Sequence, residues 1–233
     1  MIHRAKMAAR KNADLYQAIF DAHGLRYIRD DQAFRAIDPP PPYYSPMTLL
    51  SPIPDDVLRQ LVAKQADNFG HMVGLKDSFC LIKEPIPGLT SLFEATWLWH
   101  PGASLAPGNW VRIDRSGALL AWETAWKAAG SATDQRMFPD ALRDNPDIAF
   151  FAAIEDEEII AGCIANRSAD CVGVSNIFAR NETANIYSQA AAAAASLAPG
   201  KPLVSYDRGV GLGHLHSAGF QPVGSLRVWV AAS

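Results

Sequence analysis

Several polar residues late in the chain have side chains that can donate or accept a proton. Histidine does so near neutral pH, and His214 and His216 lie two positions apart after a glycine-rich segment. Residues two apart on a helix face in different directions, so this pair is not spaced to bind a metal ion. Both histidines also suit a helix surface or cap. The other candidates for proton transfer are Ser175, Asn176, Tyr206 and Asp207.

Alternating apolar runs and turn signals predict the elements that position these residues. The acidic turn 155–157 separates two apolar strands, and a third strand leads into an alanine-rich helix that Pro199 and Gly200 end. Strands are predicted over residues 148–154, 159–166, 171–178, 203–206 and 221–231, and helices over 181–198 and 210–218. Asn176 then lies in the third strand, and Tyr206 ends the fourth. Asp207 suits an N-cap of the helix that follows.

Upstream, the sequence predicts a strand over 110–114 and helices over 116–128 and 138–143. Earlier still, helices are predicted over 12–23 and 54–68, each followed by a glycine that suits a helix end. The run Pro39–Pro42 is predicted to be extended, because a residue before proline avoids the helical region. Strands over 75–83 and 92–100 are expected to pair as a hairpin. A boundary near residues 101–108 would separate an α/β extension, 1–108, from a second unit, 109–233.

The order of elements in the second unit, β-α-α-β-β-β-α-β-α-β, resembles the GNAT superfamily of acyl-coenzyme A-dependent N-acyltransferases. Two local motifs carry the resemblance: Ser217-Ala218-Gly219-Phe220 before the last strand, and the hairpin from Asp147 to Gly162. The resemblance implies an α/β fold with a mixed, mostly antiparallel central sheet flanked by helices. It covers residues 109–230, and 1–108 would be an N-terminal α/β extension.

The resemblance also implies a cofactor and a reaction. Strands 171–178 and 203–206 would splay apart, and acetyl-CoA or another acyl-CoA would bind to Ile177, Phe178 and Ala179. Its pyrophosphate would lie at the start of the next helix, near Arg180, Thr183, Ala184 and Asn185. The acyl group would pass to the amine of a small molecule or peptide. His216, Asn176 and Tyr206 are the expected catalytic residues.

Two departures from the family pattern favour an alternative function. Thr183 and Asn185 occupy positions where the family's phosphate loop has small residues, mostly glycine, and a Cβ there hinders close approach of the backbone to a phosphate. Leu215 occupies the position of the family's usual acid, a tyrosine, and Glu182 would oppose an anion. The alternative is a catalytically inactive GNAT-like protein that binds a small molecule or a partner. Thr183 or Asn181 would then cap the helix and nothing more.

A third interpretation places an acceptor in an apolar cleft between two halves of the chain. Residues 71–108 would then form a degenerate first half, and Trp97, Trp99 and Trp110 would line the cleft. The simpler role for these tryptophans is core packing. A dinucleotide loop at 209–213 is rejected, because the Rossmann pattern needs glycine where His214 stands.

Composition excludes several other classes of protein. The net charge of −3 among 233 residues argues against nucleic-acid binding, which needs clustered basic residues. No apolar run is long enough to cross a membrane, and the basic start is not followed by the apolar segment of a secretory signal. Cys80, Cys163 and Cys171 lack metal-finger spacing and are expected to be reduced, although Cys163 and Cys171 could meet across a hairpin. We therefore expect a cytoplasmic protein without a bound metal.

Overall fold

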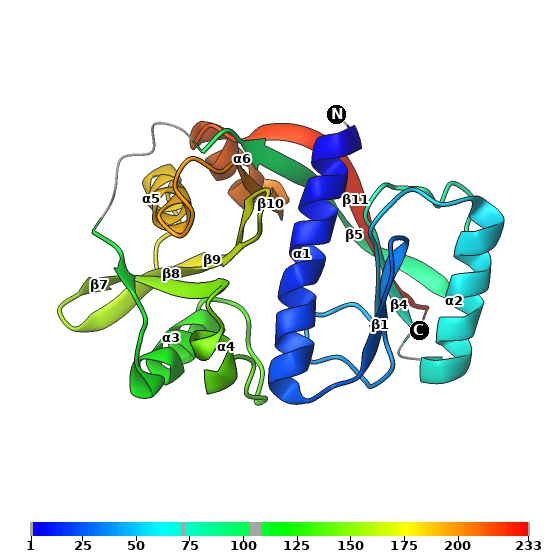
Figure 1. The fold of residues 1–233 in the computed structure, drawn as a ribbon, viewed down its shortest axis with the longest axis horizontal. Helices are drawn as coiled ribbons and strands as arrows, with labels where there is room; N and C mark the ends of the chain where they lie inside the picture. The colour runs from blue at the N-terminus through cyan, green and yellow to red at the C-terminus, as the bar shows by residue number, and fades with distance from the viewer. Residues whose placement is uncertain (1, 71–72, 103–108, 233) are drawn as a thin grey trace.

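The computed structural model describes residues 2–70, 73–102 and 109–232, which are built on one sheet of eleven strands (Figure 1). The order across the sheet is β1-β2-β3-β4-β11-β5-β10-β9-β8-β7-β6. Neighbouring strands are antiparallel except for the parallel pairs β3–β4 and β9–β10. The strands are β1 (Tyr27–Arg29), β2 (Ala33–Ala36), β3 (Met47–Leu49), β4 (Gly74–Asp77), β5 (Leu89–His100), β6 (Val111–Arg112), β7 (Ile148–Glu155), β8 (Glu158–Arg167), β9 (Val172–Ala179), β10 (Leu203–Asp207) and β11 (Gln221–Ala231).

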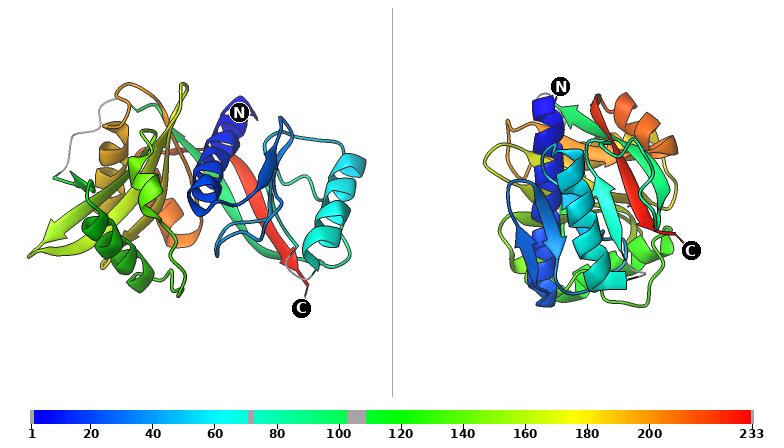
Figure 2. Two further views of the ribbon diagram at one scale, coloured as in Figure 1. Left: turned by 60° about the horizontal axis from the view of Figure 1, so that its bottom comes forward. Right: turned by 90° about the vertical axis from the view of Figure 1, so that its right-hand side faces the viewer.

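Helices cover both faces of this sheet. They are α1 (Ile2–His23), α2 (Asp55–Phe69), α3 (Ser116–Ala128), α4 (Asp140–Asp144), α5 (Ala184–Ala195) and α6 (Gly209–Ser217). Helices α1, α3 and α4 pack on one face, whereas α2, α5 and α6 pack on the other. Figure 2 shows α1 lying across the middle of the sheet, between α2 and the helices of the second unit.

Alternation along the strands produces the two apolar layers. Successive side chains of a strand point to opposite faces. Phe150 therefore packs with Trp122 of α3 on one face, and Phe151 packs with Tyr187 of α5 on the other. Near-continuous apolar sequence in β7, β8 and β9 is the consequence of burial on both sides.

The predicted α/β fold class, a mixed and mostly antiparallel sheet flanked by helices, is confirmed. The last strand has the predicted limits, and α2, β7 to β10 and α6 differ from prediction by at most one residue at either end. Helix α5 begins three residues later than predicted, because Thr183 is its N-cap. Helix α1 begins ten residues earlier, at Ile2, since its first turns bury Ala5, Ala8 and Ala9 against the sheet.

The expected hairpin between residues 75–83 and 92–100 is wrong. Strands β4 and β5 do not pair with each other, because β11 lies between them and pairs with both. The short strands β1, β2 and β3 were not predicted. They are three or four residues long, and their side chains gain burial from α1 and α2 on opposite faces.

Strands from both sides of the predicted boundary alternate within the sheet. β5, from the N-terminal extension, lies between β10 and β11 of the second unit. The division at residue 108 stays a prediction, and residues 103–108 lie outside the described ranges. This arrangement brings α1 and β4 of the extension next to the strands that carry Tyr206 and Asn176.

Candidate active site

The site begins where the parallel strands β9 and β10 separate. They pair only through Val172 with Leu203 and Gly173 with Val204. Beyond Gly173, the edge of β9 that faces β10 has no paired strand among the described residues. Unpaired backbone groups need other partners, so this edge is open to a ligand that hydrogen-bonds like an added strand.

A bulge at Asn176 contributes to the separation. The pairing of β9 with β8 shifts by one residue between Ser175 and Phe178, and Asn176 has a φ of 50°. An extra residue in one strand bends that strand and increases its twist. Asparagine tolerates this left-handed backbone conformation better than most residues, which accounts for its use here.

A cavity of about 230 Å³ occupies the opening. Ser175, Asn176 and Ile177 of β9 form one wall, and Ser205, Tyr206 and Asp207 form the other. The remaining lining comes from α1, the segment after the proline run and α3: Asn12, Leu15, Tyr16, Tyr43, Tyr44 and Trp126. The N-terminal extension therefore supplies much of the cavity, with an aromatic surface.

Behind one wall lies Lys76 of β4, whose side chain is fully buried. Its Nζ donates to Asn12 Oδ1 at 2.8 Å and to Tyr206 Oη at 3.2 Å. It also lies 4.8 Å above the ring of Tyr16. Burial lowers the pKa of Lys76, but Tyr16 and Tyr206 together raise it by more, so its pKa is above the ordinary value. Two hydrogen-bond acceptors and the faces of two aromatic rings surround its Nζ, which is an environment that suits an ammonium ion.

Asp207 also lines the cavity and lies beside Tyr187 of α5. A Cβ at Gly211 would collide with the Asp207 carboxylate and lie 2.9 Å from Tyr187 Oη, so a larger residue there would force these two side chains to shift. The Asp207 side chain accepts a 2.7 Å hydrogen bond from the N–H of Arg208. Burial raises the pKa of Asp207, and the charge of Glu182 adds to the effect, outweighing that hydrogen bond. Asp207 is not the N-cap that the sequence suggested, because Arg208 occupies that position.

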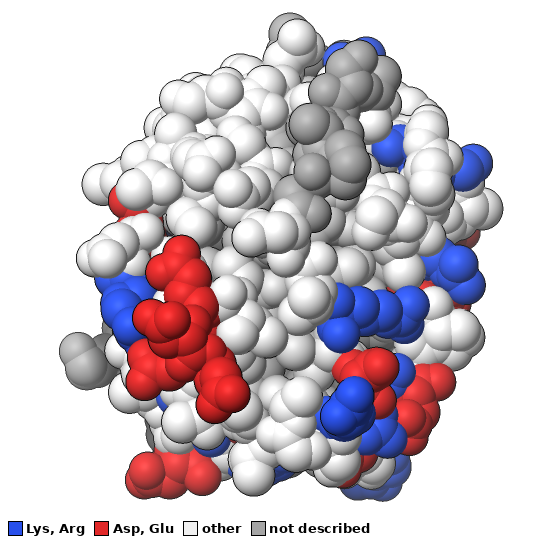
Figure 3. All heavy atoms as spheres, turned by 90° about the vertical axis from the view of Figure 1, so that its left-hand side faces the viewer, with Lys and Arg blue, Asp and Glu red and all other residues white. Residues whose placement is uncertain are grey.

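The start of α5 is the predicted phosphate site, and its surroundings are acidic. Thr183 caps the helix by accepting from the N–H of Ile186. Arg180 forms an ion pair with Glu158 at 2.6 Å. Glu155, Asp156, Glu157 and Glu158 are exposed on the adjoining hairpin, where Figure 3 shows a cluster of acidic side chains. Glu182 is exposed in the same turn as Thr183.

The predicted site residues are only partly brought together. Asn176, Ile177 and Tyr206 line the cavity, whereas Phe178 is buried against Trp122 and Ala179 is buried beside Ala161. Arg180, Thr183, Ala184 and Asn185 lie at the start of α5. His216 is exposed on the last turn of α6 and is not among the residues that line the cavity.

The tryptophans do not form the cleft that the third interpretation suggested. Trp97 donates from Nε1 to the carbonyl of Ser78, and Trp110 donates to Gln189. Trp99 carries the guanidinium of Arg4 over its ring. The cavity at the splay contains Trp126 instead. Asn12, Lys76 and Trp126 were not predicted as site residues, and no local signal marked Lys76, because β4 reads Gly-Leu-Lys-Asp and has two charged residues.

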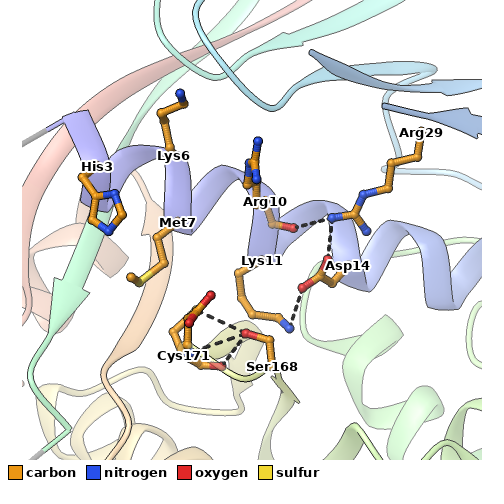
Figure 4. Close-up of a pocket in the computed structure, with 10 residues that line it drawn as sticks. His3, Lys6, Met7, Arg10, Lys11, Asp14, Arg29, Ser168 and Cys171 are labelled. Atoms are coloured by element: carbon orange, nitrogen blue, oxygen red, sulfur yellow. Dashed lines mark hydrogen bonds and ion pairs between the residues drawn. The ribbon is translucent and has the colours of Figure 1, made fainter. Parts of the chain in front are cut away.

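A larger cavity, about 470 Å³, lies along the first half of α1 next to the turn between β8 and β9. Figure 4 shows Asp14 between Lys11 and Arg29, which bind it at 2.7 and 2.6 Å. Lys11 is 2% exposed and also donates to the carbonyl of Arg167. These contacts join α1 to both parts of the chain and leave Lys11 with an acidic partner.

Metal and membrane features are also defined for the described residues. They contain no group of three or more His, Cys, Asp or Glu residues that could hold a metal ion. None of their helices is both long and apolar enough to cross a bilayer. All three cysteines are free, so Cys163 and Cys171 do not pair.

Comparison with known proteins identifies the fold. No protein-family model and no curated protein matches the sequence. Among solved structures, a conserved protein of unknown function from Staphylococcus epidermidis has a TM-score of 0.62 at 10% identity over 90% of this chain and 95% of its own. A GCN5-related N-acetyltransferase from Kribbella flavida has 0.59 at 14% identity over 97% and 96%. One from Sphaerobacter thermophilus has 0.56 at 10% identity over 96% and 89%.

The chain therefore has the fold of the GNAT superfamily, as the order of its elements predicted. The likeness extends over nearly the whole length of this chain and of those structures, the N-terminal extension included. At 10 to 14% identity, this likeness shows the fold alone.

Proposed function

We propose that this protein transfers an acyl group, most simply acetyl, from acyl-CoA to an amine. The observation that carries the proposal is the opening between β9 and β10, with a free strand edge on one side and a cavity at its end. Acyl-CoA would supply the activated thioester. The backbone of Ile177, Phe178 and Ala179 would hold the pantetheine amides along the free edge.

The proposed cofactor site has two ends, the strand edge with its cavity and the start of α5, and they fit acyl-CoA unequally. The strand edge and the cavity fit a pantetheine arm and an acyl group. The start of α5 has N–H groups and a capping threonine, which favour an anion. However, Glu182 is exposed in the turn before it, four more carboxylates are exposed on the adjoining hairpin, and Arg180 is paired with one of them. We therefore expect weak binding of the phosphates and a larger share of the affinity from the pantetheine arm.

The side chains at the cavity suggest a route for the protons. Asp207, with its raised pKa, would take a proton from the attacking amine, because a base works best when its pKa lies nearer the operating pH. Tyr206 would donate a proton to the leaving sulfur. Asn176, which lies at the bulge of β9, would position the thioester. His216 remains a predicted acid, but its exposed position on α6 gives it less support than Tyr206.

The proposed cytoplasmic location rests on cysteine chemistry. Cys80, Cys163 and Cys171 are all free. Free thiols are typical of proteins from reducing compartments.

We predict that CoA stabilises the folded protein. At a concentration of 100 times Kd, CoA should add about 2.7 kcal/mol to the free energy of unfolding, which for a chain of this length is a rise in Tm of roughly 5 to 11 °C. Thermal unfolding with CoA, acetyl-CoA and pantetheine would measure the effect. Because of the acidic surroundings of α5, pantetheine should retain much of the affinity of CoA.

The matched variants for this prediction are Thr183→Glu and Thr124→Glu, which makes the same change at an exposed position of α3. Thr183→Glu should weaken CoA binding about tenfold or more, since it adds a carboxylate at the start of α5, and should leave pantetheine binding unchanged. Thr124→Glu should leave the binding of both ligands unchanged. No stabilisation by either ligand at millimolar concentration would refute the acyl-CoA proposal.

A second prediction concerns pH. A base must be deprotonated to act, so kcat/KM should fall about tenfold per pH unit below the pKa of Asp207. That acid limb should lie above the ordinary range of aspartate, because burial raises this pKa. Asp207→Asn should remove the limb. It should also raise stability at pH 7, because a raised carboxyl pKa means that folding favours the protonated form. An unchanged limb in Asp207→Asn would assign the base elsewhere.

The second candidate function is a GNAT-like binding protein without catalysis. The acidic start of α5 and the buried Leu215 at the usual position of the acid favour it. The CoA titration separates the two candidates, because only the enzyme requires CoA to bind.

A further inference from the structure

The buried charge of Lys76 has no acidic partner in the protein. No Asp or Glu of the described residues forms an ion pair with it, and its nitrogen contacts an amide oxygen, a phenol oxygen and aromatic rings. The residues outside the described ranges include no Asp or Glu. Buried charges in proteins are normally paired. Lys11, the other buried lysine, follows that rule through Asp14.

Lys76 determines which atoms its neighbours present to the cavity. A lysine ammonium ion can only donate hydrogen bonds, so Asn12 must turn its oxygen toward Lys76 and Tyr206 must accept through its hydroxyl oxygen. The amide N–H groups of Asn12 and the O–H of Tyr206 are then left to donate elsewhere. Asn12 Nδ2 takes part in no hydrogen bond with the described residues, and both side chains line the cavity.

The cavity therefore combines hydrogen-bond donors with a carboxylate. Asn12 and Tyr206 present donors in front of a buried positive charge. Asp207, which follows Tyr206 in β10, adds a carboxylate to the lining. Tyr16, Tyr43, Tyr44 and Trp126 add an aromatic surface. The volume of about 230 Å³ suits a small molecule.

We propose that the acceptor is a free amino acid with an apolar side chain, its carboxylate bound by Asn12 in the field of Lys76. Its amine would face Asp207, and its side chain would contact the aromatic surface. A carboxylate gives Lys76 the counter-charge that the protein itself does not supply. This inference rests on the acceptor site of the proposed function, although binding of the amino acid itself does not require CoA.

Binding of apolar L-amino acids, each compared with its own amide, tests the inference. L-Phenylalanine, L-leucine, L-methionine and L-valine would be titrated by calorimetry without CoA, beside the corresponding amino-acid amides. The amides keep the amine and side chain but lack the negative charge. At least one acid should bind ten times or more tighter than its amide. Equal affinities throughout, or no binding of any acid, would overturn the inference.

Asn12→Asp is the decisive variant, because it supplies a carboxylate to Lys76 from within the protein. We expect a higher Tm, since the buried ammonium ion gains a partner, and at least tenfold weaker binding of the preferred amino acid. Asn109→Asp, which makes the same change at an exposed position before β6, should alter neither. A higher Tm with unchanged amino-acid binding would show that Lys76 has only a structural role.

Lys76→Met provides an independent check, because it removes the charge and keeps most of the volume. The preference for acid over amide should fall tenfold or more. If this variant does not fold, Asn12→Asp alone decides the question. Amino-acid binding without CoA binding would refute the acyltransferase and keep the inference. CoA-dependent acetylation of amines without preference for a carboxylate would support the acyltransferase and overturn the inference.

Discussion

Replacing Tyr206 with phenylalanine should lower kcat for acyl transfer about 100-fold, the lower end of the range for a lost general acid or base. The hydroxyl oxygen of Tyr206 accepts from Lys76, so its proton is directed away from Lys76, and the residue lines the cavity between the splayed strands. The ring should stay in place, because it packs edge-on against Trp97 at 5.2 Å. KM for the acyl donor should change little.

The leaving group distinguishes proton donation from a positioning role. With acetyl-CoA the departing sulfur gains from a proton, whereas the nitrophenolate of 4-nitrophenyl acetate needs none. Tyr206→Phe should therefore lose activity with the thioester and keep it with the nitrophenyl ester. Tyr43→Phe is the matched control: it also lines the cavity, but its hydroxyl donates to the carbonyl of Ala132. Equal losses with both donors would mean that Tyr206 positions the substrates.

Glu123→Ala should reduce the free energy of unfolding by about 4 kcal/mol. Glu123 on α3 is 1% exposed and accepts from the backbone N–H groups of Met137 and Phe138 at 2.8 and 3.1 Å. It also pairs with Lys127 and Arg136. Each buried donor left without a partner costs roughly 1–3 kcal/mol, and the two cations lose their counter-charge. Tm should fall by about 10 °C.

Chemical denaturation at several pH values would test both the size and the cause of this effect. Burial raises the pKa of Glu123, but the two backbone donors with Lys127 and Arg136 outweigh it, so its pKa is lowered. A lowered carboxyl pKa stabilises the fold above the unfolded value of about 4.3. The difference between wild type and Glu123→Ala should be constant near neutral pH and shrink as pH falls below about 4. Glu84→Ala, at an exposed loop position, should stay within about 0.5 kcal/mol.

Local sequence patterns identified most elements of the second unit. Strands β7, β8 and β9 are separated by turns with clear signals, and α5 ends at a Pro-Gly pair. Each pattern depends on neighbours within a few positions, which is why strand and helix limits were nearly correct. The cap at Thr183 was predictable for the same reason, because capping involves only the first turn of the helix.

Pairing between strands could not be predicted from local sequence patterns. β4 and β5 are near in sequence, so a hairpin was the simplest expectation, yet β11 separates them. No local signal specifies that the last strand inserts between two strands encoded more than a hundred residues earlier. The three-residue strands β1 and β3 were not predicted for a similar reason. Packing against α1 and α2 determines these strands more than the β propensity of their own residues does.

The sequence by itself determined the GNAT-like order of strands and helices, the strand that contains Asn176, and the departure from the family's phosphate loop. Local propensity and turn chemistry encode these features. The tertiary structure alone decided that Lys76 and Asn12, from elements outside the recognised half, meet Tyr206 at the opening. The role of a buried charge depends on the groups around it, and Lys76, Asn12 and Tyr206 come from three distant segments of the chain.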